Sequence, residues 1–317
     1  EAWAGEHGKS YNDEEESRHR MNVWMKNNER IEKHNSKVPK SSYSLGHNEY
    51  SDLTQEEFQK HFSLKQYRTE KPKPSKAEQS EEAREIARSL QSLELPDYVN
   101  WVQMGGVTPI KNQGACGSCW AFSTTGALEG AKFVKTGELV SLSEQNLIDC
   151  DHTDLGCSGG LMDNAFKFDE KTGGLCSEDD YPYQAVQNTE CKTDCTDVPG
   201  TIVQSFVDVP PGKERALLSA IAMQPVSVAI QADQFPFQFY KHGVLDDDKC
   251  GSEALVDHGV LAVGYGTDLD TQKPYWLVKN SWGTTWGDAG YVKMSRASNN
   301  EFGMCAILKM ASFPVVE

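Results

Sequence analysis

The sequence lacks several features, and each absence excludes a class of protein. No run of 18 apolar residues occurs among its 317 residues, so we expect no membrane-spanning helix. Positive charge is scarce: 31 Lys and Arg stand against 47 Asp and Glu, for a formal charge of −16. A nucleic-acid partner is therefore not expected, because phosphate binding needs a basic face. No Asn-x-Ser/Thr triplet is present, so N-glycosylation is not expected either.

The beginning of the chain lacks a signal peptide. It has no charged segment followed by an apolar one, and it opens on Glu1 rather than Met. We therefore expect that a leader preceded it. The acidity is concentrated later, since residues 1–94 have a net charge of −2 and residues 95–317 one of −14. An acidic domain suits acidic surroundings, although solubility alone also accounts for the charge.

Cysteine is absent from the first 115 residues, and all nine cysteines follow. Nine is odd, so four disulfides and one free thiol are the simplest arrangement in an oxidising compartment. The count alone leaves open which thiol is free. The cysteines are Cys116, Cys119, Cys150, Cys157, Cys176, Cys191, Cys195, Cys250 and Cys305.

The chain divides at a loosely organised connector. Residues 13–35 are charged and helix-favouring, with Glu16 and Arg20 spaced to pair on one face. Residues 68–92 combine prolines with many charges and few apolar side chains, with a short helix expected over 81–88. Such stretches are exposed and easily cut, so this is the candidate domain boundary.

Beyond the connector, helical patterns come first and strand patterns later. Helices are expected over 119–134 and 161–171, with another after a capping box formed by Ser141 and Glu144. Strands are expected over 225–230, 259–265, 275–279 and 290–294. This order predicts an α+β architecture with two lobes.

The strongest chemical motif is Gln113-Gly-Ala-Cys-Gly-Ser-Cys119-Trp120. Cys119 falls at the start of a predicted helix, where free N–H groups and the positive end of the dipole favour a thiolate. Gln113 can point an amide donor at a developing oxyanion. The motif therefore indicates a sulfur nucleophile.

A sulfur nucleophile needs a base, and His258 is the candidate. It lies between Asp257 and Gly259 and opens an apolar strand. Asn280 follows a second predicted strand, so it can orient the His258 ring if the two strands are neighbours. Trp282 can then shield that hydrogen bond from water.

The segment Cys116-Gly-Ser-Cys119 has three other interpretations. A redox pair would follow a strand in a βαβ unit, which the surrounding pattern does not show. A zinc site would need a second pair of ligands at the right spacing, and none follows. If both cysteines were structural, the free thiol would lie elsewhere.

Together these motifs resemble the papain family of cysteine proteases, and within it the cathepsin L group. The Cys-Gly-Ser-Cys-Trp segment is a recognised signature of that family. The helical face within 13–35 resembles the family's pro-segment, with Trp24 where Phe is also usual, and the motif at 46–52 resembles a second pro-segment pattern, with Tyr50 replacing Phe. Further similar segments are 141–146, 157–163, 181–183 and 280–283, and 95–101 resembles the start of a mature enzyme.

The resemblance implies a papain-like two-lobed fold, with a helical lobe bearing Cys119 and a β-barrel-like lobe bearing His258. Residues 1–94 would be an inhibitory, helical pro-segment, with 68–94 as its connector, and 95–317 the mature peptidase. The protein's own pro-segment would block the cleft, and acid would trigger its removal. Five histidines in the segment bear on that trigger: His7, His19, His34, His47 and His61.

The resemblance also implies the roles of individual residues. Gln113, Cys119, His258 and Asn280 would be catalytic. The implied disulfides are Cys116–Cys157, Cys150–Cys191 and Cys250–Cys305, which leaves Cys176 and Cys195 to pair with each other. Glycines would present backbone to the substrate, and apolar side chains would line the pocket for the second residue before the scissile bond. The implied substrate-binding residues are Gly159, Gly160, Leu161, Met162, Ala229, Val256, Asp257, Trp282 and Met310.

The implied activity is endopeptidase cleavage of protein and peptide substrates, with bulky apolar residues preferred in that pocket. No cofactor or metal is expected. We expect the protein to be a monomer and to be secreted or lysosomal/vacuolar. Two alternatives remain. A non-catalytic storage or binding protein on the same fold would lack one of the four catalytic residues, and an aminopeptidase would carry an extra segment that blocks one end of the cleft.

Overall fold

The computed structural model describes residues 2–62, 81–90, 92, 94–252 and 255–317. The N-terminal part forms α1 (Ala2–Glu6), α2 (Glu14–Asn35), β1 (Tyr43–Leu45), α3 (Gln55–Phe62) and α4 (Glu81–Ser89). The helix expected over 81–88 is therefore present as α4. Most of the remaining connector, residues 68–80, 91 and 93, lies outside the described residues. No helix in the described ranges is long and apolar enough to cross a membrane.

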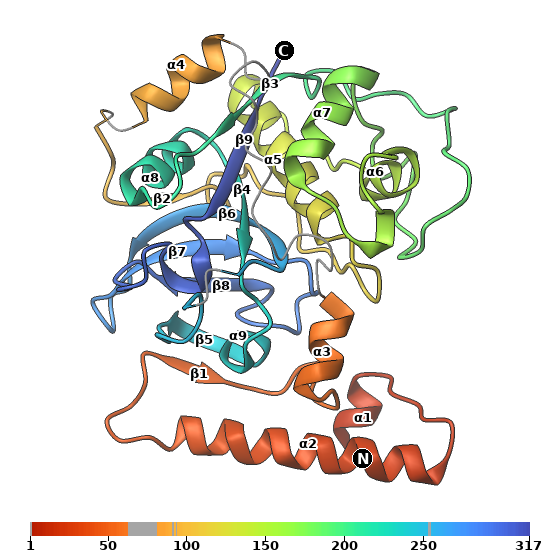
Figure 1. The fold of residues 1–317 in the computed structure, drawn as a ribbon, viewed down its shortest axis with the longest axis vertical. Helices are drawn as coiled ribbons and strands as arrows, with labels where there is room; N and C mark the ends of the chain where they lie inside the picture. The colour runs from red at the N-terminus through yellow and green to blue at the C-terminus, as the bar shows by residue number, and fades with distance from the viewer. Residues whose placement is uncertain (1, 63–80, 91, 93, 253–254) are drawn as a thin grey trace.

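Three α-helices and a short 3₁₀ turn make up the helical lobe, and the α-helices lie together at the upper right of Figure 1. They are α5 (Cys119–Thr136), α6 (Glu144–Cys150), η1 (Gly156–Ser158) and α7 (Met162–Thr172). Glycines let the central helix α5 lie close to the strands: a Cβ at Gly126 would stand 2.7 Å from the Leu261 side chain, and one at Gly130 would stand 2.4 Å from Pro225. The helix therefore packs directly on the second lobe.

The predicted capping box before α6 was wrong in detail. The N-cap is Ser143, whose hydroxyl accepts the Asn146 N–H, and not Ser141. Glu144 is therefore the first helical residue, and its carboxylate does not reach back to the cap. It turns inward instead, where it accepts hydrogen bonds from Lys111 and Thr125.

The second lobe is built on one sheet. Its strands in chain order are β2 (Val99–Asn100), β3 (Val203–Asp208), β4 (Val226–Ile230), β5 (Tyr240–Leu245), β6 (His258–Thr267), β7 (Pro274–Lys279), β8 (Tyr291–Ser295) and β9 (Met310–Val316). The strand order is β1-β5-β8-β7-β6-β4-β9-β3, with β2 on β6. Helices α8 (Glu214–Met223) and α9 (Phe235–Gln238) and the turn η2 (Met304–Ala306) connect the strands. The expected α+β, two-lobed architecture is confirmed.

The N-terminal segment completes this sheet. Strand β1 pairs antiparallel with β5, with Tyr43 opposite Gly243. A Cβ at position 243 would stand 2.3 Å from the Ser42 carbonyl oxygen, so the glycine permits the close approach. Figure 1 places α1 and α2 beyond this edge, and α4 at the opposite end of the molecule beside β3. The N-terminal segment thus reaches both ends of the peptidase domain.

Four disulfides join eight of the nine cysteines. They are Cys116–Cys157, Cys150–Cys191, Cys176–Cys195 and Cys250–Cys305. All nine cysteines lie within the described ranges, and Cys119 is the one left free. The sequence count, which could not identify the free thiol, is resolved in favour of the residue that begins α5.

Candidate active site

The free thiol lies where the two lobes meet. Cys119 is the first residue of α5 and is fully buried. Gly259 is the second residue of β6, and its N–H donates to the Cys119 sulfur at 3.4 Å. Gly259 can come this close because it has no side chain; a Cβ there would stand 3.3 Å from the Cys119 carbonyl oxygen. His258 directly precedes Gly259 in sequence, so the residue that bears the imidazole adjoins the residue whose N–H contacts the sulfur.

The geometry of His258 and Asn280 fixes the proton on the imidazole. Strands β6 and β7 are antiparallel neighbours, and Asn280 follows β7 directly, as the prediction required. Asn280 Oδ1 lies 2.8 Å from His258 Nε2 and also accepts the Ser281 N–H at 2.8 Å. Because a carboxamide oxygen can only accept, Nε2 must carry the hydrogen. The other nitrogen, Nδ1, has no hydrogen-bond partner in the described part of the chain.

The indole of Trp282 covers this histidine. The two rings stack with centroids 4.7 Å apart, and Trp282 is fully buried. Residues of the N-terminal segment pack on the same indole: Phe58 and Tyr50 meet it edge-on at 5.5 and 5.7 Å. Trp282 therefore links the N-terminal segment to the imidazole.

Burial holds both groups neutral in this form of the protein. Desolvation raises the pKa of Cys119 to about 12, although the Gly259 N–H favours the thiolate. Desolvation likewise lowers the pKa of His258 to about 4, although the bond to Asn280 favours the imidazolium. Both shifts favour the neutral thiol and the neutral imidazole in this form of the protein.

Gln113 is held with its amide nitrogen free to donate. Its Oε1 accepts the Ser281 hydroxyl at 2.7 Å, which fixes the orientation of the carboxamide. One hydrogen of Nε2 then goes to the Cys116 carbonyl at 3.0 Å, and the second takes none of the hydrogen bonds found among the described residues. Gln113 and Asn280 are thus tied together through Ser281.

Several predicted substrate-binding residues gather at one small pocket. Leu161, Met162 and Met310 line it, and Ala229 lies beside Met310 in the β4–β9 ladder. The sequence reasoning missed Asp163 and Ser312, which complete the lining and share a hydrogen bond of 2.6 Å. Ser312 was open to prediction, because residues i and i+2 of a strand lie on one face.

Other predicted residues lie outside that lining. Val256 is buried but is not among the residues that line the pocket. Asp257 accepts the Ala232 N–H at 2.7 Å, so it supports the loop after β4. Gly159 and Gly160 lie in the segment just before α7. The Gly159 N–H donates to the Gly156 carbonyl at 3.3 Å and its own carbonyl accepts the Leu155 N–H at 2.9 Å, so the backbone groups of Gly160, and not those of Gly159, are left for a substrate. No cluster of possible metal ligands occurs among the described residues.

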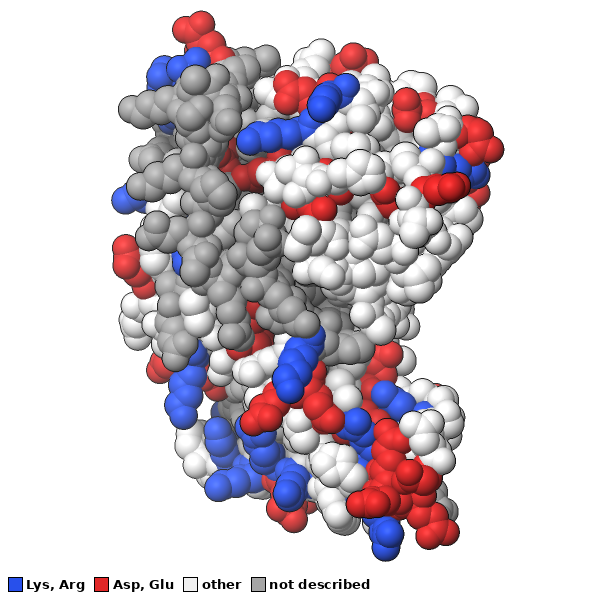
Figure 2. All heavy atoms as spheres, turned by 45° about the vertical axis from the view of Figure 1, so that its right-hand side comes forward, with Lys and Arg blue, Asp and Glu red and all other residues white. Residues whose placement is uncertain are grey.

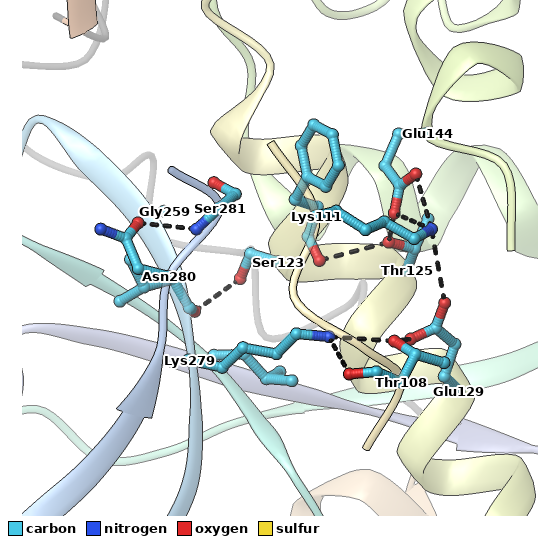
Figure 3. Close-up of a pocket in the computed structure, with 13 residues that line it drawn as sticks. Thr108, Lys111, Ser123, Thr125, Glu129, Glu144, Gly259, Lys279, Asn280 and Ser281 are labelled. Carbon is cyan, nitrogen blue, oxygen red and sulfur yellow. Dashed lines mark hydrogen bonds and ion pairs between the residues drawn. The ribbon is translucent and has the colours of Figure 1, made fainter. Parts of the chain in front are cut away.

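A buried charge cluster lies beneath the catalytic residues, and sequence reasoning did not identify it. Figure 3 shows Lys111 reaching Glu144 and Glu129, with Asn280 and Ser281 on the far wall of the same cavity. Lys111 Nζ lies 2.8 Å from Glu144 and 3.9 Å from Glu129, and this proximity raises the pKa of Lys111 despite its burial. Lys279 closes the cavity and donates to both oxygens of Thr108 at 2.9 Å. The cluster joins α5 and α6 to β7, so it fastens the two lobes together.

A thiol at a helix start, an imidazole held by a carboxamide and an N-terminal segment packed on the indole that covers the imidazole are typical of precursor cysteine peptidases. Comparison with known proteins agrees. Residues 95–315 match the model of the papain family cysteine proteases, and residues 1–58 match the cathepsin propeptide inhibitor domain. The chain belongs to the papain family.

Relatives place it more narrowly. It is 46% identical to a cathepsin L-like peptidase of Aedes aegypti, with 98% of this chain and 91% of that protein covered. It is 44% identical to human cathepsin L2, covering 99% and 91%. The solved digestive procathepsin L2 proteinase of Tenebrio molitor larval midgut superposes with a TM-score of 0.86 at 36% identity, covering 99% of this chain and 98% of that one. The protein is a cathepsin L-like cysteine protease precursor with an N-terminal inhibitor segment.

Proposed function

We propose that the precursor yields an endopeptidase in which Cys119 is the nucleophile, His258 its base and Asn280 the residue that orients the base. The observation that carries this assignment is the Asn280–His258 hydrogen bond. It places the ring proton on Nε2 and leaves Nδ1 as the nitrogen able to take the proton from a thiol.

The reaction follows from these positions. Transfer of the Cys119 proton to His258 Nδ1 gives a thiolate and an imidazolium, and the thiolate attacks the carbonyl carbon of the scissile bond. The oxyanion so formed is stabilised by the Gln113 amide and by the Cys119 backbone N–H. The imidazolium returns its proton to the leaving amine, which leaves a thioester on Cys119. Water, deprotonated by His258, then hydrolyses the thioester and releases the acid and the thiol.

The domain boundary forms part of the proposal, with 1–94 as the inhibitory pro-segment and 95–317 as the peptidase. Support comes from the contacts of the N-terminal segment with the peptidase. Besides the β1–β5 pairing, Asn48 donates to the Gln238 carbonyl at 2.7 Å, and Arg30 stacks over the Phe235 ring. The segment inhibits by remaining bound across the active site, and acid releases it.

Substrate preference is proposed from the pocket at Met310. Its apolar lining favours a bulky apolar side chain at the second residue before the scissile bond. Gly160 presents its backbone groups to the same substrate residue, because neither takes a hydrogen bond among the described residues. We place the enzyme outside the cytosol, secreted or lysosomal/vacuolar, because four disulfides persist only where conditions are oxidising.

The test is acid activation followed by cleavage of dipeptide reporters that differ in the second residue from the cleavage point. The expected result is processing to a form that begins near Leu95 and that cleaves Phe- and Leu-containing reporters faster than Arg-containing ones. The Cys119→Ala precursor should stay uncut and inactive. Folded, processed wild-type protein that binds peptides without cleaving them would support the storage or binding protein instead.

A further inference from the structure

Two buried carboxyl groups lie side by side behind the substrate-binding glycines. Asp151 and Asp154 are 2% and 4% exposed. The two side chains are close enough that Asp151 raises the pKa of Asp154. One oxygen of each group, Oδ2, has no donor among the described residues. No ion pair reaches either carboxyl in the same ranges.

The other oxygen of Asp154 holds the chain next to the cleft. Asp154 Oδ1 accepts the Leu161 N–H at 3.0 Å and the Asn164 side-chain amide at 3.0 Å. Gly160 is pressed between this carboxyl and the Trp120 indole: a Cβ there would stand 2.8 Å from Asp154 Cγ and 2.5 Å from the ring. Substitution of Gly160 would therefore displace the carboxyl or the indole.

The hydrogen bond from Leu161 N–H to Asp154 fixes the direction of the Gly160 carbonyl. Gly160 C=O and Leu161 N–H belong to one trans peptide unit, so the two bonds point in opposite directions. With the N–H directed inward to Asp154, the carbonyl is directed away from the protein interior. Within the described residues, neither the N–H nor the C=O of Gly160 takes a hydrogen bond. Both groups are free for a peptide substrate.

We propose that Asp154 is a positioning residue for substrate binding: it shares one proton with Asp151 and holds Leu161 N–H so that Gly160 C=O faces the substrate backbone. The inference rests on the proposed peptidase function and deepens it. In the shared-proton state, Asp154 Oδ2–H donates to the Asp151 carboxylate, while Oδ1 keeps both of its donors. The peptide unit accepts a strong hydrogen bond on one side and offers a polarised carbonyl on the other.

The surroundings make this arrangement sensitive to alkali. The groups that face the pair are the Asn164 amide from α7, the Trp120 indole from α5 and the backbone of Thr153, whose N–H donates to Asp151. None of them titrates near neutrality, and the neighbouring His152 is exposed. Burial and the Asp151 charge raise the pKa of Asp154 to about 8. Above that pH two buried carboxylates would repel each other and loosen the Gly160–Leu161 unit.

The test compares two substrates of the mature enzyme. A dipeptide reporter reaches Gly160, and a reporter with a single residue before the scissile bond does not. The ratio of their kcat/KM values therefore isolates the Gly160 contact from the chemistry at Cys119, and alkylation of Cys119 counts the folded sites. For wild type, the ratio should fall above pH 8 through a rising KM for the dipeptide.

Three variants make the result decisive. Asp154→Ala should lower the ratio about tenfold at every pH, as expected for one weakened hydrogen bond. Asp154→Asn, which imitates the protonated carboxyl, and Asp151→Asn, which removes the like charge, should keep the ratio high and flat above pH 8. Asn164→Ala removes the other donor to the same oxygen. It should keep the ratio below pH 8 and move the alkaline fall to higher pH, because the Asn164 hydrogen bond lowers the pKa of Asp154.

The outcomes separate the two proposals. An unchanged ratio in Asp154→Ala, or the wild-type alkaline fall in both asparagine variants, would overturn the positioning role. Wild-type protein that cleaves neither reporter after activation would instead overturn the peptidase function on which this inference rests.

Discussion

Phe58 of the N-terminal segment meets Trp282 edge-on, with ring centroids 5.5 Å apart. The same indole stacks on His258, so Trp282 contacts both the N-terminal segment and the imidazole. Removal of the segment would expose Trp282 to water and change the environment of His258. The precursor and the mature enzyme should therefore differ in the protonation of their catalytic groups.

Alkylation of Cys119 measures that difference directly. A thiol with a pKa of about 12 is ionised to about one part in 10⁵ at pH 7, so the precursor should react slowly until the solution is strongly alkaline. The mature enzyme should react rapidly at pH 7, because solvent and the nearby imidazolium stabilise the thiolate. The rate is measured against pH for both forms, with Cys119→Ala as the unlabelled control. Equal rates at pH 7 would contradict the proposed effect of the segment.

Replacement of Asn280 should impair catalysis without unfolding the protein. Asn280→Ala removes the acceptor for His258 Nε2–H, so the imidazole loses its tautomer and its orientation. We expect kcat to fall about a hundredfold, the lower range of general acid–base contributions. Asn300→Ala, which removes an asparagine bonded to the Cys250 carbonyl in the same lobe, is the matched control. Wild-type turnover in Asn280→Ala would remove Asn280 from the catalytic set.

The pocket at Met310 gives a prediction about specificity. Met310→Glu should place a carboxylate in a pocket lined mainly by apolar side chains, beside the Asp163–Ser312 pair. The ratio of kcat/KM for Arg- over Phe-containing dipeptides should rise about tenfold, through hydrogen bonds to a charged group. Met310→Gln has the same shape without the charge and should raise the ratio far less. If the two variants behave alike, charge at this position does not set the preference.

The catalytic centre could be predicted from sequence because its residues sit at element ends that local patterns mark. Cys119 begins a helix with helical spacing and a glycine stop, and His258 and Asn280 flank strands that are apolar enough to recognise. Strands β3, β5 and β9 were not predicted. In β5 the stretch Tyr240–Leu245 contains Lys241 and an exposed His242. It becomes a strand through its pairing with β1 on one side and β8 on the other, both distant in sequence.

Long-range polar pairs were equally invisible. The sequence paired Arg20 with Glu16 at i,i+4, and that contact exists at 3.9 Å. Arg20 nonetheless makes its shorter contacts, at 2.9 Å, with both oxygens of Glu57, which no local pattern could indicate. The Lys111 cluster is a similar case, because Glu129 and Glu144 approach Lys111 only when α5 and α6 pack.

The additional disulfide should stabilise the helical lobe without serving catalysis. Cys176 and Cys195 close a loop with a sequence separation of 19, for which the expected contribution is about 3 kcal/mol. The double variant Cys176→Ser/Cys195→Ser should lose about that much free energy of unfolding in urea and keep its kcat/KM. Peptide mapping of the unreduced wild type is the control. Recovery of both residues as alkylated free cysteines would refute the bond.

The last prediction is that acid releases the pro-segment through specific pairs. Glu57 is partly buried, which favours its neutral form, but hydrogen bonds from Thr54 and the charge of Arg20 outweigh this and lower its pKa. A carboxyl whose pKa is lower in the folded state stabilises that state above its unfolded value, about 4.3, and loses the contribution as pH falls through the folded value. The stabilisation that Glu57 contributes is therefore lost as the pH falls below about 4 to 5.

His47 acts in the same direction at a higher pH. It stacks on Trp24 at 4.2 Å, and burial lowers its pKa. Its neutral form therefore stabilises the folded segment above the unfolded value of about 6.5, and the contribution is lost as pH falls below that. His34, also buried, contacts the Tyr43 carbonyl at the start of β1. The side chain of His61 lies outside the part of the chain that the structure describes.

The precursor should be stable near pH 7 and process itself near pH 4–5, with cleavage between Thr69 and Leu95 found by mass spectrometry. Glu57→Gln should move the midpoint of processing to higher pH, because it weakens the pairing with Arg20 in advance. His47→Phe, which keeps a ring on Trp24 but cannot be protonated, should move it to lower pH. Opposite shifts from the two variants would separate pair disruption from a general effect of acid on the peptidase. Wild-type precursor that matures equally fast at pH 7 and pH 4.5 would show that acid is not the trigger.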